Sequence, residues 1–208
     1  MNKFSSGPKL PEEVLREPLK TEILWGCDSG GSPRFPVDLE TIHTRRFSQD
    51  PKPMAAFRKA VSSAVARVWV VDEYFLAPDN DKSPDGRIFT VLDWLHVDLI
   101  ASDIRILTKK HDEIPEEALQ LFQMREDEIN RKRTRQPMKC RIQVSTRLKL
   151  KFDYIHDRFA IVDDELWHFG ATVGGFHASV NAASRGWSAI DSGAIAFFEL
   201  AWEKCEEL

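Results

Sequence analysis

A histidine and an arginine stand at the start of an otherwise apolar segment. The stretch "YIHDRFAIVDDELWHFGATVGG" runs from Tyr154 to Gly175 and contains His156, Arg158 and Asp163. A histidine can serve as a nucleophile or as a general acid, and a nearby carboxylate can orient its ring. An arginine adds a fixed positive charge with a bidentate fork for a phosphate. The residue types therefore predict a site for phosphate chemistry at this segment.

The spacing extends beyond these three residues. His156 is followed at the second position by Arg158, then after four residues by Asp163 and after six more by Gly170. This run resembles the signature of the phospholipase D superfamily, which is His-x-Lys, four residues, Asp, six residues and Gly-Ser-x-Asn. The order of the elements expected over residues 53–208 is also similar to that family.

Three positions depart from the signature. Arg158 replaces the lysine, Ala171 the serine and Val173 the asparagine. This form is similar to a degenerate, phosphate-binding branch of the family, which includes the C-terminal domains of certain MIT-domain proteins. It is also similar to short bacterial members, some of them linked to mobile elements or defence.

The resemblance implies a mechanism and a set of site residues. In that family one histidine attacks phosphorus to form a phosphohistidine, and a second protonates the leaving oxygen, without metal or other cofactor. Carried over, it assigns His156 and Asp163 as catalytic and Arg158 as phosphate-binding. The residues themselves add Gly170 and Thr172, in a turn that can offer backbone N–H groups to an anion, and His177, which follows two glycines and can face the site from the next helix. The side chain of Val173 cannot donate a hydrogen bond as an asparagine would, and the loss of one such donor costs about 10²–10³ in rate. We therefore expect weak or absent catalysis.

The signature occurs once, whereas the family's complete site uses two copies. We therefore expect a homodimer, with the two half-sites meeting at a two-fold axis. A protein partner in a larger system is the alternative source of the second half. Arg158 has an alternative role as well, in an ion pair with Asp157 or Asp72.

A basic run precedes the His156 segment. Residues 131–151 contain nine lysines and arginines and no acid, in a chain whose formal net charge is -4. We expect nucleic acid, or alternatively anionic lipid, to bind this run. The residues chosen for this contact are Arg131, Lys132, Arg133, Arg135 and Lys139. The alternative is a solvated helix end with a charged loop.

Hydrophobic periodicity predicts the elements that position these residues. Helical spacing covers residues 53–68, 85–100, 114–133, 174–185 and 191–208, and β-branched or aromatic runs predict strands at 21–25, 67–76, 103–108, 140–144 and 186–190 and a hairpin over 157–170. Alternating helices and strands predict an α/β layered sandwich with a mixed, largely parallel sheet covered by helices on both faces. Its expected range is 51–208, after an irregular arm over 1–50.

The remaining features limit the function classes. Three widely spaced cysteines form no metal-binding pattern and indicate reduced thiols, and no apolar run is long enough to span a membrane. We therefore expect a cytoplasmic protein without metal or cofactor. The first hypothesis is a dimeric phosphate-binding module that takes nucleic acid. The second is a metal-independent phosphodiesterase, and the third is a scaffold in which His156 and Arg158 only stabilise the fold.

Overall fold

The computed structural model describes residues 18–26, 31–47, 54–78, 83, 85–133, 138–176 and 180–207. Within these residues the strands are β1 (Glu22–Trp25), β2 (Arg67–Val71), β3 (Asp103–Leu107), β4 (Arg141–Ser145), β5 (Phe159–Val162), β6 (Glu165–Phe169) and β7 (Ala182–Ser188). The helices are α1 (Leu39–Phe47), α2 (Ala55–Ser63), α3 (Gly86–Trp94), α4 (Glu116–Lys132), α5 (Leu148–Lys151) and α6 (Ala194–Glu206), with a 3-10 turn, η1, at Val173–Gly175.

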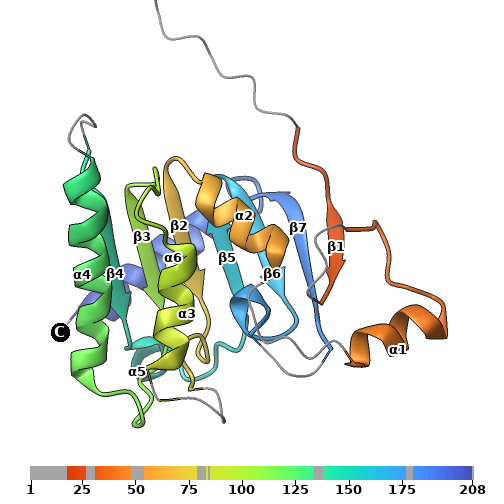
Figure 1. The fold of residues 1–208 in the computed structure, drawn as a ribbon, viewed down its shortest axis with the longest axis horizontal. Coiled ribbons are helices and arrows are strands. Elements are labelled where there is room, and N and C mark those ends of the chain that lie inside the picture. The colour runs from red at the N-terminus through yellow and green to blue at the C-terminus, as the bar shows by residue number, and fades with distance from the viewer. Residues whose placement is uncertain are drawn as a thin grey trace, which may run out of the picture.

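The described strands form one mixed sheet in the order β1-β7-β6-β5-β2-β3-β4 (Figure 1). Strand β2 pairs in parallel with β3, and β3 with β4. The pairs β2–β5, β5–β6, β6–β7 and β1–β7 are antiparallel. The α/β class and the mixed sheet are confirmed, but antiparallel pairs outnumber parallel ones. The β5–β6 pair is antiparallel because its two-residue turn leaves no room for a crossover helix.

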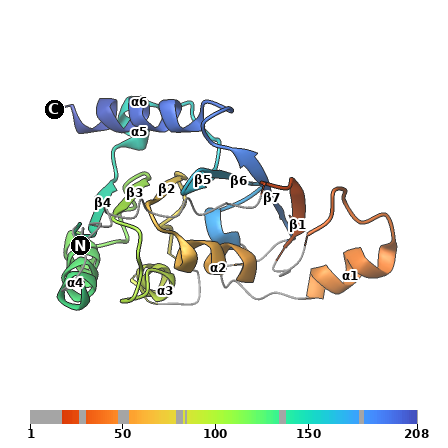
Figure 2. The ribbon, with the colours of Figure 1, turned by 90° about the horizontal axis from the view of Figure 1, so that it is seen from above.

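Helices cover both faces of the sheet, as the sequence predicts. Figure 2 shows α5 and α6 on one face and α2, α3 and α4 on the other. Side chains alternate along β2, so that Val68 and Val70 join the core beneath α2–α4, whereas Trp69 and Val71 join the core beneath α6. Trp69 stacks on Phe198 of α6 with ring centroids 4.7 Å apart. Both faces of the central strands are therefore buried.

The N-terminal region adds an edge strand to this sheet. Strand β1 pairs with β7, and Leu24 is fully buried in the main core. Helix α1 extends away from the sheet beyond β1 (Figure 2). Strand β1 thus shares a hydrogen-bond ladder and a core with the later strands. The domain boundary at residue 50 stays a prediction.

The helix expected over 174–185 is wrong where the structure describes it. Residues 173–175 form the turn η1, with Gly174 and Gly175 at positive φ, and β7 begins at Ala182. Left-handed glycines end helical geometry. Residues 182–185 are instead held by ladders on both sides, to β1 and to β6, which outweigh the helix propensity of the alanines.

The strand directions bring five chain segments to one edge of the sheet. Strand β5 is antiparallel to β2 and to β6, so its amino end lies beside their carboxyl ends. The carboxyl ends of β3 and β4 lie at this same edge, because both are parallel to β2. This edge is called the site edge below.

Candidate phosphate-binding site

His156 is held at the site edge by a carboxylate from the end of β2. Its Nδ1 lies 2.7 Å from Oε1 of Glu73, whose side chain is only 2% exposed, whereas the His156 side chain is 72% exposed. An ionised carboxylate only accepts hydrogen bonds, so Nδ1 carries the proton. In the neutral ring, Nε2 then presents its lone pair. The geometry suits a nucleophile or an acceptor of a ligand proton.

Two lysines share the same carboxylate. Nζ of Lys149 is 3.1 Å from Oε2 of Glu73, and Nζ of Lys109 is 4.0 Å from it. The Lys109 ammonium also lies 4.0 Å from the ring centroid of Tyr74. Neither lysine is among the site residues predicted from the sequence, although Lys149 lies in the basic run. Each lysine follows a parallel strand, and the carboxyl ends of parallel strands meet at one edge of the sheet. This placement is a sequence signal that could have identified both lysines as site residues.

Arg158 lies next to this cluster at the start of β5. Its Nε is 3.8 Å from Oδ1 of Asp72, and its guanidinium carbon is 5.0 Å from the Tyr74 ring centroid. Within the described residues, that Nε is buried without a hydrogen-bond acceptor. The expected ion pair with Asp72 is therefore present, but it is long. The Arg158 side chain is 24% exposed, so a ligand would contact the exposed part of the guanidinium rather than Nε.

The pKa values of the two carboxyl groups at the site, Asp72 and Glu73, are shifted in opposite directions. Burial raises the pKa of Asp72 to about 6, against the hydrogen bonds from the Val173 and Tyr74 N–H groups and the charge of Arg158. Burial acts in the same direction on Glu73, but the hydrogen bonds from His156 and Lys149 outweigh it and leave the pKa of Glu73 below its ordinary value. Glu73 is therefore ionised at neutral pH. Lys109, Lys149 and Arg158 set three cations against these two acids.

Asp163 lies at the opposite edge of the sheet, beyond the far end of β5. Its carboxylate accepts hydrogen bonds from the backbone N–H groups of Val65, Ala66 and Arg67, at 2.7–3.2 Å. Its φ of 54° places it in the left-handed region, which aspartate tolerates better than most residues. The expected contact with His156 is absent, because the four residues of β5 separate the two. Glu73 holds His156 instead.

Several backbone donors in the segment after β6 are engaged within the protein. The Gly170 N–H donates to the carbonyl of Ala182, and the Val173 N–H donates to Asp72. Thr172 is buried, and its carbonyl accepts the Gly175 N–H. These backbone donors are therefore occupied within the protein. His177 lies outside the described residues.

The first members of the basic run lie away from the site edge. Lys132 pairs with Asp98 at 2.9 Å, and Arg131 donates to the carbonyl of Asp127. Arg133 is 8% exposed and donates to the carbonyls of Leu99 and Ala101, before the amino end of β3.

These residues and Lys139 precede β4, and the five residues of β4 separate them from the site edge. Arg135 lies outside the described residues. The four described residues among the five expected to contact nucleic acid therefore lie away from His156, and their contact with a ligand stays a prediction. Only the last members of the basic run, such as Lys149, come close to His156.

No cluster of three or more His, Cys, Asp or Glu side chains that could hold a metal ion occurs among the described residues. No helix in the described part of the chain has both the length and the apolar character needed to cross a membrane. His111 lies near Glu73, with its Nε2 3.1 Å from the Glu73 carbonyl oxygen, and burial lowers its pKa.

Comparison with known proteins gives structural neighbours only. No family model matches the chain, and no curated protein matches it. NucT from Helicobacter pylori is 10% identical with a TM-score of 0.44, over 89% of this chain and 97% of that chain. Phosphatidylserine synthase from Haemophilus influenzae Rd KW20 is 10% identical with a TM-score of 0.43, over 86% of this chain and 36% of that one.

A third neighbour is TrmBL2, an archaeal chromatin protein with a novel mode of DNA binding. It is 12% identical with a TM-score of 0.38, over 94% of this chain and 55% of that chain. The chain thus spans about half of TrmBL2 and about a third of the synthase. Identities and scores at this level assign neither family nor activity to the protein.

Proposed function

We propose that this protein binds a phosphate-bearing ligand at the site edge, that the ligand is nucleic acid, and that catalysis is weak or absent. The observation that carries the proposal is the position of His156. It is fixed by Glu73 and exposed to solvent, in a cluster that includes Lys109, Lys149 and Arg158. Cations with spare donors at one exposed edge are what a phosphodiester requires.

The proposed ligand contact lies at the carboxyl end of the basic run, at Lys149, rather than at its first members. Electrostatic attraction to a phosphodiester falls off beyond a Debye length of about 10 Å at 0.1 M salt. Arg133 is committed to carbonyl groups near the start of β3, and Lys132 to Asp98. Lys109, Lys149 and Arg158 are therefore the residues proposed to contact the ligand.

A second half-site completes the proposal. One chain supplies one His156, and phosphoryl transfer of the phospholipase D type needs a second histidine to protonate the leaving oxygen. A homodimer that joins two site edges supplies it from the same sequence. Sedimentation equilibrium tests this arm, because a strictly monomeric protein at micromolar concentration contradicts the dimer.

An active phosphodiesterase is the second candidate, and the His156–Glu73 geometry favours it. Nε2 would attack phosphorus while the P–O bond to the leaving group breaks, with the leaving oxygen protonated by the partner's histidine. Water would then hydrolyse the phosphohistidine. Incubation of labelled single- and double-stranded oligonucleotides with EDTA tests this. Cleavage by the wild type that is lost in His156→Ala would establish the phosphodiesterase. Binding without any cleavage would instead indicate a binding module.

The binding proposal is tested by a charge reversal and its matched control. Arg158→Glu is expected to weaken oligonucleotide affinity at least 10-fold in fluorescence anisotropy, because a phosphate contact becomes a repulsion. Arg131→Glu, at the opposite edge, is expected to change affinity less than 2-fold at 0.15 M salt. Equal effects of the two variants, or none, would refute the site-edge assignment.

A further inference from the structure

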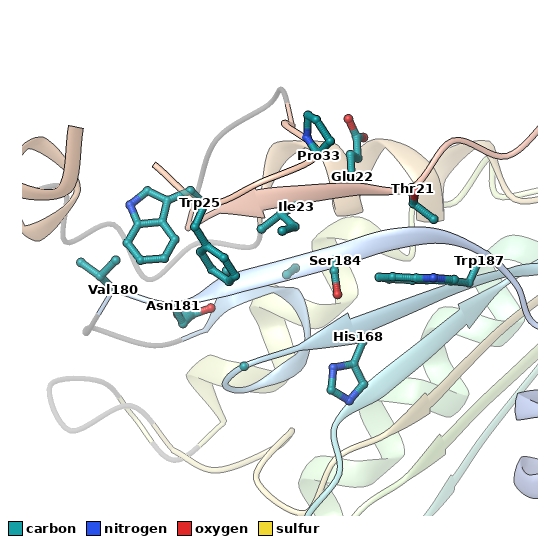
Figure 3. Close-up of a pocket in the computed structure, with 14 residues that line it drawn as sticks. Thr21, Glu22, Ile23, Trp25, Pro33, His168, Val180, Asn181, Ser184 and Trp187 are labelled. Carbon is teal, nitrogen blue, oxygen red and sulfur yellow. The ribbon is translucent and has the colours of Figure 1, made fainter. Parts of the chain in front are cut away.

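A second concave site lies on the sheet beside the site edge. A cavity of about 540 Å³ is bounded by β1, β6 and β7, on the part of the sheet that α6 leaves uncovered. Figure 3 shows Trp25 and Val180 toward one end, Trp187 toward the other, and Ser184 and His168 between them. Its volume falls within the roughly 300–1,000 Å³ typical of small-molecule sites.

The walls of this cavity suit an uncharged, flat group. Trp25, Phe35 and Trp187 supply aromatic rings, while Ser184 and His168 supply hydrogen-bonding groups. None of its described lining residues is a lysine or an arginine. The acidic lining residue Glu22 is paired with Arg185, whose Nε lies 3.6 Å from Oε1 of Glu22. Phosphate therefore belongs at the site edge, and a ring system with polar edges belongs in the cavity.

One contact joins the cavity to the site edge. Nε2 of His168, in the cavity wall, lies 2.5 Å from Oδ1 of Asp157, the residue that follows His156 in the chain. Gly170 also lines the cavity and follows the carboxyl end of β6 at the site edge. The cavity and the site edge are therefore adjacent.

We propose that the cavity receives unpaired bases of a single-stranded nucleic acid whose phosphate lies at His156, Lys149 and Arg158. This inference rests on the proposed function and narrows its ligand to single strands. Bases in a duplex are stacked and paired, so their faces are not available to aromatic side chains. A strand that crosses the site edge can instead place its bases in the cavity. Stacking tolerates any base, so the selectivity is for strandedness rather than for sequence.

Fluorescence anisotropy with end-labelled oligonucleotides tests the proposal. We expect a single strand to bind about 10-fold more tightly than a duplex, or than an abasic strand of equal length. Trp187→Ala, which removes a 41% exposed ring, is expected to remove most of this preference. Ser184→Phe fills the middle of the cavity and is expected to do the same. Trp187→Phe retains a stacking face and restores the preference.

The control is Phe89→Ala, which removes a ring of 49% exposure from α3, outside the cavity lining. It is expected to leave every affinity unchanged. Arg158→Glu, run in parallel, separates the two proposals. If it weakens all oligonucleotides while single, duplex and abasic strands bind alike, the cavity inference fails and the phosphate site stands.

If no oligonucleotide binds, both the cavity inference and the proposed function fail. Binding to phosphatidylglycerol vesicles that Trp187→Ala weakens, without any preference for single strands, would assign the cavity to lipid and overturn the inference.

Discussion

Single residues at the site edge act through partners distant in sequence. His156 is one of the residues selected from its spacing, but its partner, Glu73, lies 83 positions away and is almost fully buried. From sequence alone, a carboxylate at the end of a buried strand can either cap the backbone or belong to a ligand site. The sheet pairing of β2 with β5 decides between them, because it places Glu73 beside the residues preceding β5.

Asp163 is predicted to stabilise the fold without contributing to the ligand site. Asp163→Ala removes an acceptor for three backbone N–H groups and leaves a non-glycine residue at positive φ. We expect the free energy of unfolding to fall by about 2–4 kcal/mol in urea titrations. Asp163→Asn tolerates the backbone conformation and keeps one oxygen, so its loss should be smaller. Oligonucleotide affinity that falls for both variants while they remain folded would contradict this role.

Asp72 makes stability depend on pH. Burial raises its pKa to about 6, above the ordinary 3.8. Between these values the native state retains a proton that the unfolded chain has released, so this group lowers the free energy of unfolding as pH rises from about 4 to 6. Asp72→Asn does not titrate. The stability of wild type relative to Asp72→Asn should therefore fall by roughly 2–3 kcal/mol between pH 4 and pH 7. A difference that is constant with pH would contradict the raised pKa.

Elements were largely predictable from periodicity, and strand direction was not. Met54, Phe57 and Val61 recur at helical spacing, and all three are buried around α2. The expected helix over 174–185 failed because the ladders on both sides of β7 are non-local. Strand β1 was predicted, but its place beside β7 was not, since an edge partner leaves no periodic signal of its own.

Helix α6 should be essential to the second core. Phe198 is fully buried between Trp69 and Trp202, with ring centroids 4.7 and 5.9 Å away. Phe198→Ala is expected to cost about 3–5 kcal/mol in the free energy of unfolding, because the cavity it leaves cannot collapse between stacked rings. Its neighbour Phe197 is 43% exposed, and Phe197→Ala should cost less than about half as much. Equal losses in denaturant titrations would show that α6 is not packed through Phe198.

At the scale of the whole molecule, the proposed ligand binding depends on local charge rather than on net charge. The chain carries a formal net charge of -4, yet three cations gather at the site edge. Their arrangement follows from topology, since Lys109 and Lys149 come after neighbouring parallel strands and Arg158 comes before an antiparallel one. A model of binding based on the isoelectric point alone would predict repulsion of nucleic acid.

The salt dependence of binding should report this local charge. Each phosphate neutralised on a single strand contributes about -0.7 to the slope of log affinity against log salt. Lys109, Lys149 and Arg158 therefore predict a slope of about -2 for one half-site, and about -4 where a dimer engages one strand with both. Lys149→Gln should reduce the magnitude by about 0.7 per half-site. Lys132→Gln, at the opposite edge and paired with Asp98, should leave it unchanged. A flat salt profile, or equal reductions by both variants, would place the ligand elsewhere on the molecule.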